Sequence, residues 1–243
     1  AISIGMLLSA LAMTWHLVHF HYVKFNKESM YEVSKKIILL CIPLLLSAQF
    51  IAGILNEALD LTDTNQELFI SMSHNIFGVL SIAIVVPILE EVLFRGAIEG
   101  HLLRKGWSPK WAILVSALIF GIIHGNPAQI PFAFLIGLLF GWLYYRTGSL
   151  VPGIVGHIIN NSFGAWTMFT ATREELSQTT METLGTTITY ILLVLAIIVF
   201  IGMYLYLNKY LPKPTNIQVK AINEQDITCL LYTSPSPRDY AAS

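Results

Sequence analysis

Long apolar runs alternate with short polar stretches along the chain. The runs cover residues 1–23, 36–55, 73–103, 108–125, 129–146, 149–170 and 186–208. A helix needs about 20 residues to cross the hydrocarbon layer of a membrane, so each run is long enough or nearly long enough. The pattern predicts an all-α, polytopic bundle with about seven transmembrane helices, placed in the cell membrane as a multi-pass protein.

The polar stretches between the runs alternate in charge. The basic stretches and the segment after the last run carry Lys24, Lys27, Lys35, Lys36, Arg104, Lys105, Lys110, Arg146, Lys209, Lys213 and Lys220. The second stretch carries Glu57, Asp60, Asp63 and Glu67 without a base, and the sixth, "TREELSQTTMET", has three acids and one arginine. Because positive loops stay in the cytoplasm, we expect the basic stretches inside and Ala1 outside, unless a further helix precedes it.

Composition supports a membrane protein and excludes several classes. Hydrophobic residues make up 55% and charged residues 12%, which is about half the usual charged fraction of a soluble domain. A net charge of −1 argues against a nucleic-acid partner. The two cysteines, Cys41 and Cys229, lie far apart and lack metal-ligand spacing, so neither a disulfide framework nor a cysteine metal site is expected.

The same features divide the chain into four parts. Residues 1–69 hold the N-terminal transmembrane helices and an acidic outer loop, and residues 70–170 form a core. Residues 171–210 hold an outer loop and the last transmembrane helix. Residues 211–243 read as a disordered cytoplasmic tail, because their end, "CLLYTSPSPRDYAAS", is rich in Ser and Pro. This end also resembles translated adapter DNA, so we assign it no function.

Three charged residues interrupt an apolar run at "PILEEVLFRG". One charge near the bilayer centre costs on the order of 3 kcal/mol, so such groups must pair or face water. Arg95 follows Glu91 by four residues and is expected to neutralise it, and Glu99 could join them. Glu90 lies on another helix face without a helical partner. A carboxylate left unpaired in a low-dielectric site can act as a general acid or base.

Further polar residues are expected at a similar depth. If 73–103 is one helix, Glu90 lies about 21 Å from its basic end, and His124 lies about 24 Å along the next helix. His157 and Asn161 lie about 12 and 18 Å into a third helix, so tilted helices could bring all four around one cavity. The alternative, a break at Pro87, puts Glu90 at the cytoplasmic surface and leaves these groups without partners.

The residue types favour hydrolysis by an activated water. His157 and Asn161 share a helix face and offer N–H donors for an oxyanion, while Phe120 shares a face with His124. No Ser or Cys stands at an obvious nucleophile position. Asn161 alone could instead hydrogen-bond between helices. The remaining histidines are expected to pack or lie at interfaces: His16, His19, His21, His74 and His101.

A zinc site is the alternative chemistry for this cluster. Glu90, His124 and His157 could ligate zinc and leave a position open for water. However, the HExxH motif is absent, and a further ligand from Asn161 would be an amide, which suits zinc poorly. We therefore predict no metal and no cofactor, with zinc kept as the alternative.

Three motifs resemble one known family. "EEVLFR" (90–95), "FGIIH" (120–124) and "HIINN" (157–161) are similar, in spacing and order, to the EExxxR, FxxxH and HxxxN motifs of the CAAX protease and bacteriocin-processing family, also called the ABI family. The resemblance covers about residues 70–170. It implies an all-helical intramembrane endopeptidase with a cavity open to the cytoplasm and the bilayer. The better-studied members look like glutamate-type proteases without metal.

The resemblance also implies residue roles. Glu90 and His124 would activate the water, and His157 and Asn161 would form the oxyanion hole. Supporting roles would fall to Glu91, Arg95 and Phe120. The short chain resembles the bacterial branch of the family, which implies bacteriocin or peptide processing, or self-immunity, rather than cleavage of prenylated CAAX tails.

The sequence thus predicts an endopeptidase whose partners are the lipid bilayer and a peptide or membrane-protein substrate. One alternative is a non-catalytic immunity or scaffold protein of the same fold. Another is a transporter, since buried charges also mark proton relays. A transporter should have a second polar cluster toward the outer face, and the sequence shows little there beyond His74, Asn75 and the acidic loop.

Overall fold

The computed structural model describes residues 2–23 and 33–211, and within these ranges the chain forms helices without any strand. Most of the predicted tail 211–243 lies outside the described residues, as do Lys24, Lys27 and Cys229. Five helical stretches are long and apolar enough to cross a membrane: Ile2–His19, Lys35–Leu59, Ile76–Arg104, Ile130–Thr147 and Thr186–Tyr210. The prediction of an all-α polytopic membrane bundle is therefore confirmed.

The helices follow the predicted runs closely. In chain order they are α1 (Ile2–His19), α2 (Lys35–Leu59), α3 (Gln66–Ser73), α4 (Ile76–Leu80), η1 (Ser81–Val85), α5 (Val86–Glu91), η2 (Val92–Glu99), α6 (Gly100–Arg104), α7 (Pro109–Ile123), α8 (Ile130–Thr147), α9 (Val151–Thr170), α10 (Arg173–Ser177), α11 (Thr180–Leu184) and α12 (Thr186–Tyr210). The shorter α7 and the more polar α9 complete the set of seven runs.

The helix that carries the charged motif is continuous from Ile76 to Arg104. Its α-helical parts are interrupted by two π-helical segments, η1 and η2. Pro87 falls in the first turn after η1, where its missing N–H is tolerated, so the helix does not break there. Such π-segments often occur at functional sites, and here they flank the short α5 that ends at Glu91.

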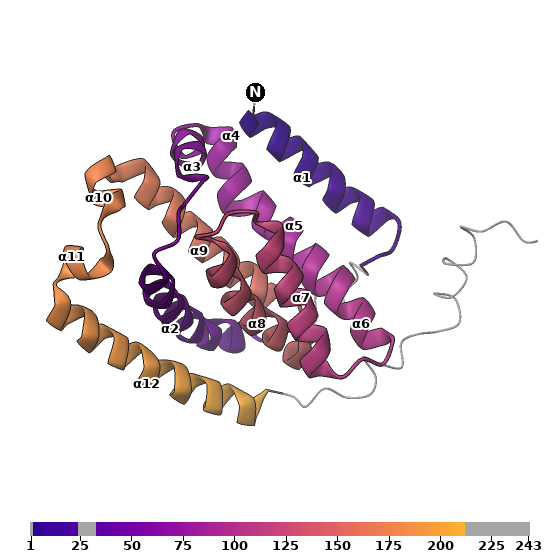
Figure 1. Ribbon diagram of the computed structural model, residues 1–243. Helices are drawn as coiled ribbons and strands as arrows, with labels where there is room; N and C mark the ends of the chain where they lie inside the picture. Colours follow the sequence, from indigo (N-terminus) through magenta and orange to yellow (C-terminus); the bar gives the residue numbers. More distant parts are fainter. Residues whose placement is uncertain (1, 24–32, 212–243) are drawn as a thin grey trace, which may run out of the picture.

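The helices form one bundle with α8 and α9 near its centre (Figure 1). The largest buried apolar cluster joins α2, α8 and α12 and includes Leu44, Leu45, Phe140, Leu143 and Leu207. Many large apolar side chains of α12 are exposed on its outer side, as expected where a helix faces lipid.

Glycines bring the central helices close together. A Cβ at Gly137 on α8 would lie 3.1 Å from the ring of Phe120 and 3.2 Å from the Cβ of Ala117, both on α7. At Gly153 on α9, a Cβ would lie 2.6 Å from a carboxylate oxygen of Glu91. Small residues of this kind allow the close helix contacts that stabilise membrane bundles, and here they seat neighbouring helices against the charged motif.

Candidate active site

Arg95 forms the buried centre of the charged motif. Its Nη1 donates to Oε1 of Glu91 over 2.9 Å, and both side chains are about 1% exposed. Its Nη2 donates to the carbonyl of Gly137 over 3.1 Å, and its guanidinium lies over the rings of Phe120 and Phe140 at 4.5 and 5.3 Å. The predicted Glu91–Arg95 ion pair is therefore present. Through its further contacts with Phe120 and Gly137, Arg95 also joins η2 to α7 and α8.

Glu99 does not extend this network by hydrogen bonding. It is fully buried one turn beyond Arg95, yet neither carboxylate oxygen has a hydrogen-bond partner among the described residues. The pairing of Arg95 with Glu91 thus defines the charged core of the site.

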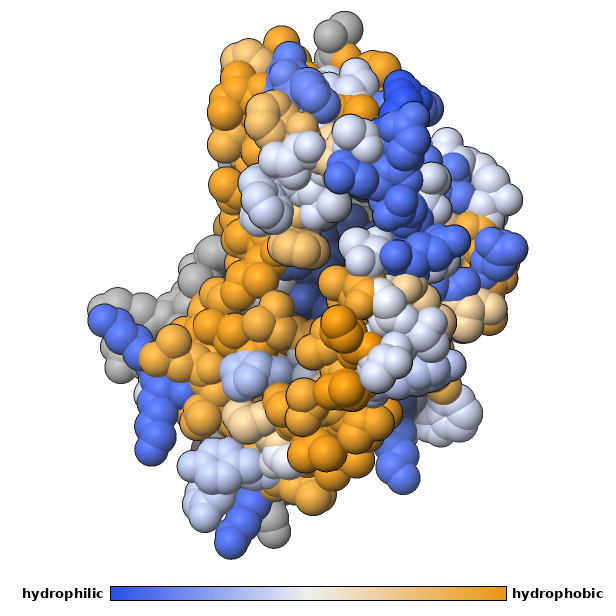
Figure 2. Space-filling view, turned by 90° about the vertical axis from the view of Figure 1, so that its left-hand side faces the viewer, coloured by the Kyte–Doolittle hydropathy of each residue, from blue (hydrophilic) through white to orange (hydrophobic). Residues whose placement is uncertain are grey.

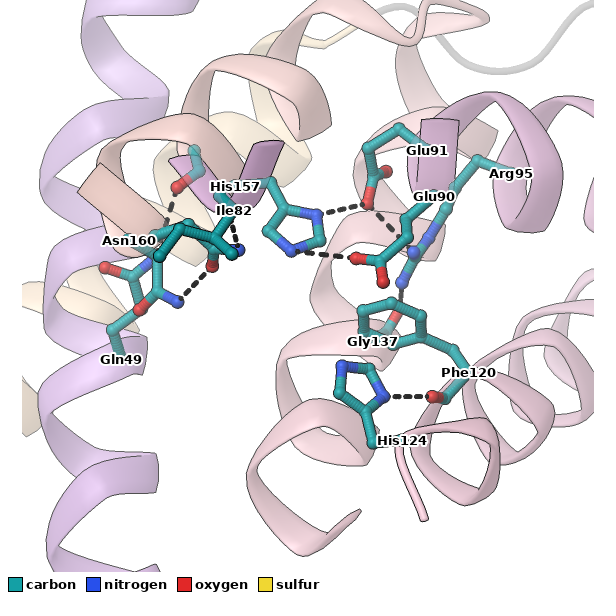
Figure 3. Close-up of polar contacts among 12 residues, drawn as sticks. Gln49, Ile82, Glu90, Glu91, Arg95, Phe120, His124, Gly137, His157 and Asn160 are labelled. Atoms are coloured by element: carbon teal, nitrogen blue, oxygen red, sulfur yellow. Dashed lines mark hydrogen bonds and ion pairs between the residues drawn. The ribbon is translucent and has the colours of Figure 1, made fainter. Parts of the chain in front are cut away.

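His157 connects both glutamates of the motif (Figure 3). Its Nδ1 lies 3.2 Å from Oε1 of Glu91, and its Nε2 lies 3.3 Å from Oε2 of Glu90. A neutral imidazole carries one N–H, so two contacts to carboxylates require a further proton on the ring or on a carboxyl group. The partner that Glu90 lacks on its own helix is therefore supplied by α9.

His124 lies on the other side of the aromatic ring of Phe120. It caps the C-terminal end of α7, and its Nδ1 lies 2.7 Å from the carbonyl oxygen of Phe120. Because a carbonyl only accepts, Nδ1 carries the proton and Nε2 of the neutral ring is an acceptor. Within the part of the chain that the structure describes, His124 forms no hydrogen bond to Glu90, and His157 occupies that place instead.

Phe120 separates the two imidazoles. Its ring meets His124 edge-on at 4.9 Å and His157 edge-on at 5.8 Å between ring centroids. It also stacks under the guanidinium of Arg95. The phenylalanine of the second motif thus orders the site through three aromatic and cation–π contacts.

Asn161 lies one turn beyond His157, with its amide held on both sides. Its Nδ2 donates to the carbonyl of Ile82 over 2.9 Å, and its Oδ1 accepts from Nδ2 of Asn160 over 3.0 Å. An amide nitrogen has two N–H groups, so one donor of Asn161 remains for another partner.

A cavity of about 450 Å³ joins these residues. Glu90, His124, His157, Asn160 and Asn161 line it together with apolar side chains of α3, α8 and α9. On the side of the molecule that carries α10 and α11, a hollow has hydrophilic residues at its bottom, hydrophobic residues below and to its left, and hydrophilic residues to its upper right (Figure 2). The structure therefore brings all four predicted catalytic residues to one pocket inside an apolar bundle.

Three contributors were not predicted from the sequence. Asn160 fixes the amide of Asn161, Phe140 packs against His157 at 5.4 Å, and the carbonyl of Gly137 accepts from Arg95. Asn160 is part of the motif "HIINN" and could have been noticed there. The other two act through an apolar ring and a backbone atom, for which the sequence carries no polar signal.

The zinc alternative finds no preformed ligand set. In residues 2–23 and 33–211, no group of three His, Cys, Asp or Glu side chains is arranged to hold a metal ion. The acidic partners of His157 are engaged with that ring and with Arg95 instead.

The fold and this site define a polytopic membrane protein with carboxylate and imidazole groups buried between its helices. A family model described as type II CAAX prenyl endopeptidase Rce1-like matches residues 72–163. This part of the chain belongs to the CAAX protease family.

Two of three curated relatives have names that agree with this family. The chain is 38% identical over 81 residues to the protein named "Putative membrane peptidase YdiL" of Bacillus subtilis, covering 33% of each chain. It is 33% identical over 106 residues to the membrane-embedded CAAX protease MroQ of Staphylococcus aureus, covering 42% of each. It is 28% identical over 122 residues to the UPF0177 protein YxdF of Lactococcus lactis, covering 50% of this chain and 63% of that one. The chain thus covers less than two thirds of the length of each relative. No solved structure gives a significant match.

Proposed function

We propose that this protein is an intramembrane endopeptidase that uses an activated water and no metal. The observation that carries the proposal is the contact between Glu90 and His157 at the wall of a cavity large enough for a peptide segment. The printed names of YdiL and MroQ, a membrane peptidase and a CAAX protease, support the same activity.

In this proposal Glu90 is the general base. Its carboxylate accepts a proton from water while the water oxygen attacks the carbonyl carbon of the scissile bond. The side chain is 19% exposed, so water can reach it, whereas Glu91 beside it is buried and paired with Arg95. When the tetrahedral intermediate collapses and the C–N bond breaks, Glu90 returns the proton to the departing amine.

The two histidines take different parts. The unprotonated Nε2 of His124 accepts a hydrogen bond from the attacking water and orients it, because its Nδ1 proton is held by Phe120. Asn161 and His157 donate N–H groups to the developing oxyanion. The Nε2–H of His157, which contacts Glu90 in the free protein, becomes available for this when Glu90 takes up the proton of the water. Asn161 has the free donor for this task, and Asn160 and Ile82 fix its amide plane.

The supporting residues hold these groups in place. Arg95 neutralises the carboxylate of Glu91, which in turn contacts Nδ1 of His157. The hydrogen bond from Arg95 to the carbonyl of Gly137 fixes the position of Arg95 relative to α8. Phe120 sets the separation of the two imidazoles. The proposed biological role is processing of a bacteriocin or another peptide, or self-immunity, which rests on the resemblance of the three motifs to those of bacterial family members.

Cleavage of a fluorogenic peptide library by the detergent-purified protein tests the proposal. Replacing the base, Glu90→Gln, is expected to lower the cleavage rate by roughly 100-fold to 10 000-fold. The matched control is Glu174→Gln, which makes the same change on an exposed glutamate of α10. Equal rates for Glu90→Gln and the unchanged protein would refute a catalytic role.

Two further measurements separate the alternatives. In cells, a non-catalytic immunity or scaffold protein would still protect its host when it carries Glu90→Gln, whereas the proposed protease would not. Treatment with a chelator is expected to leave cleavage unchanged. Loss of cleavage with chelator and recovery with zinc would establish the metal-dependent alternative instead.

A further inference from the structure

The cavity lies in one half of the bundle. Its lining comes from Asn65 and Leu68 at the start of α3, from His124 and Gln129 around the α7–α8 loop, and from the second half of α9. The second half of α9 leads into α10 and α11 at this end of the bundle, and α3 packs against α9 (Figure 1). The cavity therefore opens at that end, away from α6 and the start of α7.

The polar loops at this end connect directly to the cavity wall. Asn126, two residues after His124, is fully buried and accepts from the backbone N–H of Thr64 over 3.1 Å. Its Nδ2 donates to Asp63 over 2.7 Å. The acidic loop between α2 and α3 and the loop after His124 thus form one rim.

The two ends of the described bundle differ sharply in charge. The cavity end carries the acids Glu57, Asp60, Asp63, Glu67, Glu174, Glu175 and Glu182, with Arg173 as the base among them. The opposite end carries Lys35, Lys36, Arg104, Lys105, Lys110 and Lys209. Arg173 is itself paired with Glu67, which leaves the rim strongly acidic. Because basic loops preferentially remain in the cytoplasm, this charge difference indicates that the cavity end faces away from the cytoplasm.

The positions of Glu90 and His124 along their helices also place them nearer the acidic end of the bundle than the basic end. Glu90 lies 14 residues before Arg104 on one continuous helix, or about 21 Å of axial rise. The hydrocarbon layer is about 30 Å thick, so Glu90 lies beyond its middle when Arg104 stands at the cytoplasmic boundary. His124 closes α7 at its end remote from Lys110, which gives a similar depth.

We propose that the catalytic cavity opens to the extracytoplasmic side and the outer leaflet. The substrate class is then a peptide or membrane-protein segment whose scissile bond is exposed on that side, with apolar side chains that fit walls such as Phe69, Met72 and Met168. This proposal builds on the proposed peptidase function and departs from the cytoplasmic opening that the family resemblance implies.

Sided cysteine labelling tests the proposal without any activity assay. In a Cys229→Ser background, Cys41 stays buried at 1% exposure, and single cysteines are introduced as Leu68→Cys and Asp60→Cys at the rim. The matched control is Lys105→Cys at the opposite end. In intact bacteria, a membrane-impermeant maleimide is expected to label both rim cysteines, and Lys105→Cys only after permeabilisation. Rim labelling only after permeabilisation, or Lys105→Cys labelling in intact cells, would overturn the proposal.

A second measurement links the side to catalysis. When Leu68→Cys is labelled from outside in intact cells, its cleavage of a peptide substrate is expected to be lost relative to the same unlabelled variant. Retained cleavage after complete labelling would contradict entry through this rim. Equal cleavage by Glu90→Gln and the unchanged protein would refute the proposed peptidase mechanism. The labelling pattern would still show which side of the membrane the cavity faces.

Discussion

Nε2 of His157 lies 3.3 Å from Oε2 of Glu90, although 67 positions separate the two residues in the sequence. The same ring contacts Glu91 through Nδ1, and Glu91 is held by Arg95. The carboxylate of Glu90, the imidazole of His157 and the Glu91–Arg95 ion pair are therefore linked by direct contacts inside an apolar bundle.

Arg95→Met is expected to destabilise the protein by about 3–5 kcal/mol, because it leaves the buried charge of Glu91 without its partner. The double variant Glu91→Gln, Arg95→Met should lose less, since it removes both charges together. Thermal unfolding in detergent measures both. A double variant less stable than Arg95→Met alone would show that the pair does not act as a unit.

Gly153→Ala is expected to disturb catalysis through Glu91. The added methyl would lie 2.6 Å from a carboxylate oxygen of Glu91, so that this group or α9 must move. A displacement of His157 by about 1 Å is expected to lower the cleavage rate about 100-fold. The matched control is Gly53→Ala on α2, where a Cβ would meet nothing within 4 Å. Similar rates for both variants would contradict the close contact.

Asn126→Leu should loosen the rim of the cavity. It removes the acceptor of Thr64 and the donor to Asp63 at a fully buried position, a loss of about 1–3 kcal/mol. Limited proteolysis is expected to cut the 60–65 loop faster and thermal unfolding to begin earlier. As a control, Asn75→Leu removes an exposed cap of α4 and should leave the rate of cutting in that loop unchanged.

Acid should weaken the link between α3 and α10. The Arg173 guanidinium, which hydrogen-bonds the Glu67 carboxylate, lowers the pKa of that exposed group. A carboxyl whose pKa is lower in the folded state stabilises the fold above its unfolded pKa of about 4. This stabilisation is lost as the pH falls through the folded pKa. The difference in melting temperature between the unchanged protein and Glu67→Gln should be present at neutral pH and disappear in acid. A difference that persists in acid would rule out the ion pair as its source.

The apolar runs predicted the helices well because spanning a membrane requires long, uninterrupted apolar stretches. The helical spacing also predicted the Glu91–Arg95 pair, since both residues lie on one face of one helix. Contacts between helices were predicted less well. Depth along separate helices indicated that His124 and His157 lie near Glu90, but the rotation and tilt of each helix decide which ring touches it.

The elements that set rotation and tilt are not polar. Gly137 and Gly153 allow α8 and α9 to approach their neighbours, and Phe120 and Phe140 fill the space around Arg95. These residues look like ordinary membrane-helix residues in the sequence. The end of the bundle at which the cavity opens was also not evident from the sequence. It depends on which helix ends and loops lie together in the folded chain.

The most direct test of the central claim is a double-mutant cycle on Glu90 and His157. Cleavage rates are measured for Glu90→Gln, His157→Gln and the double variant, with His101→Gln as an exposed control outside the site. If the two groups act together, the double variant should be hardly slower than Glu90→Gln alone, with a coupling of about 0.5–3 kcal/mol. Additive losses, or full activity of either single variant, would contradict the account.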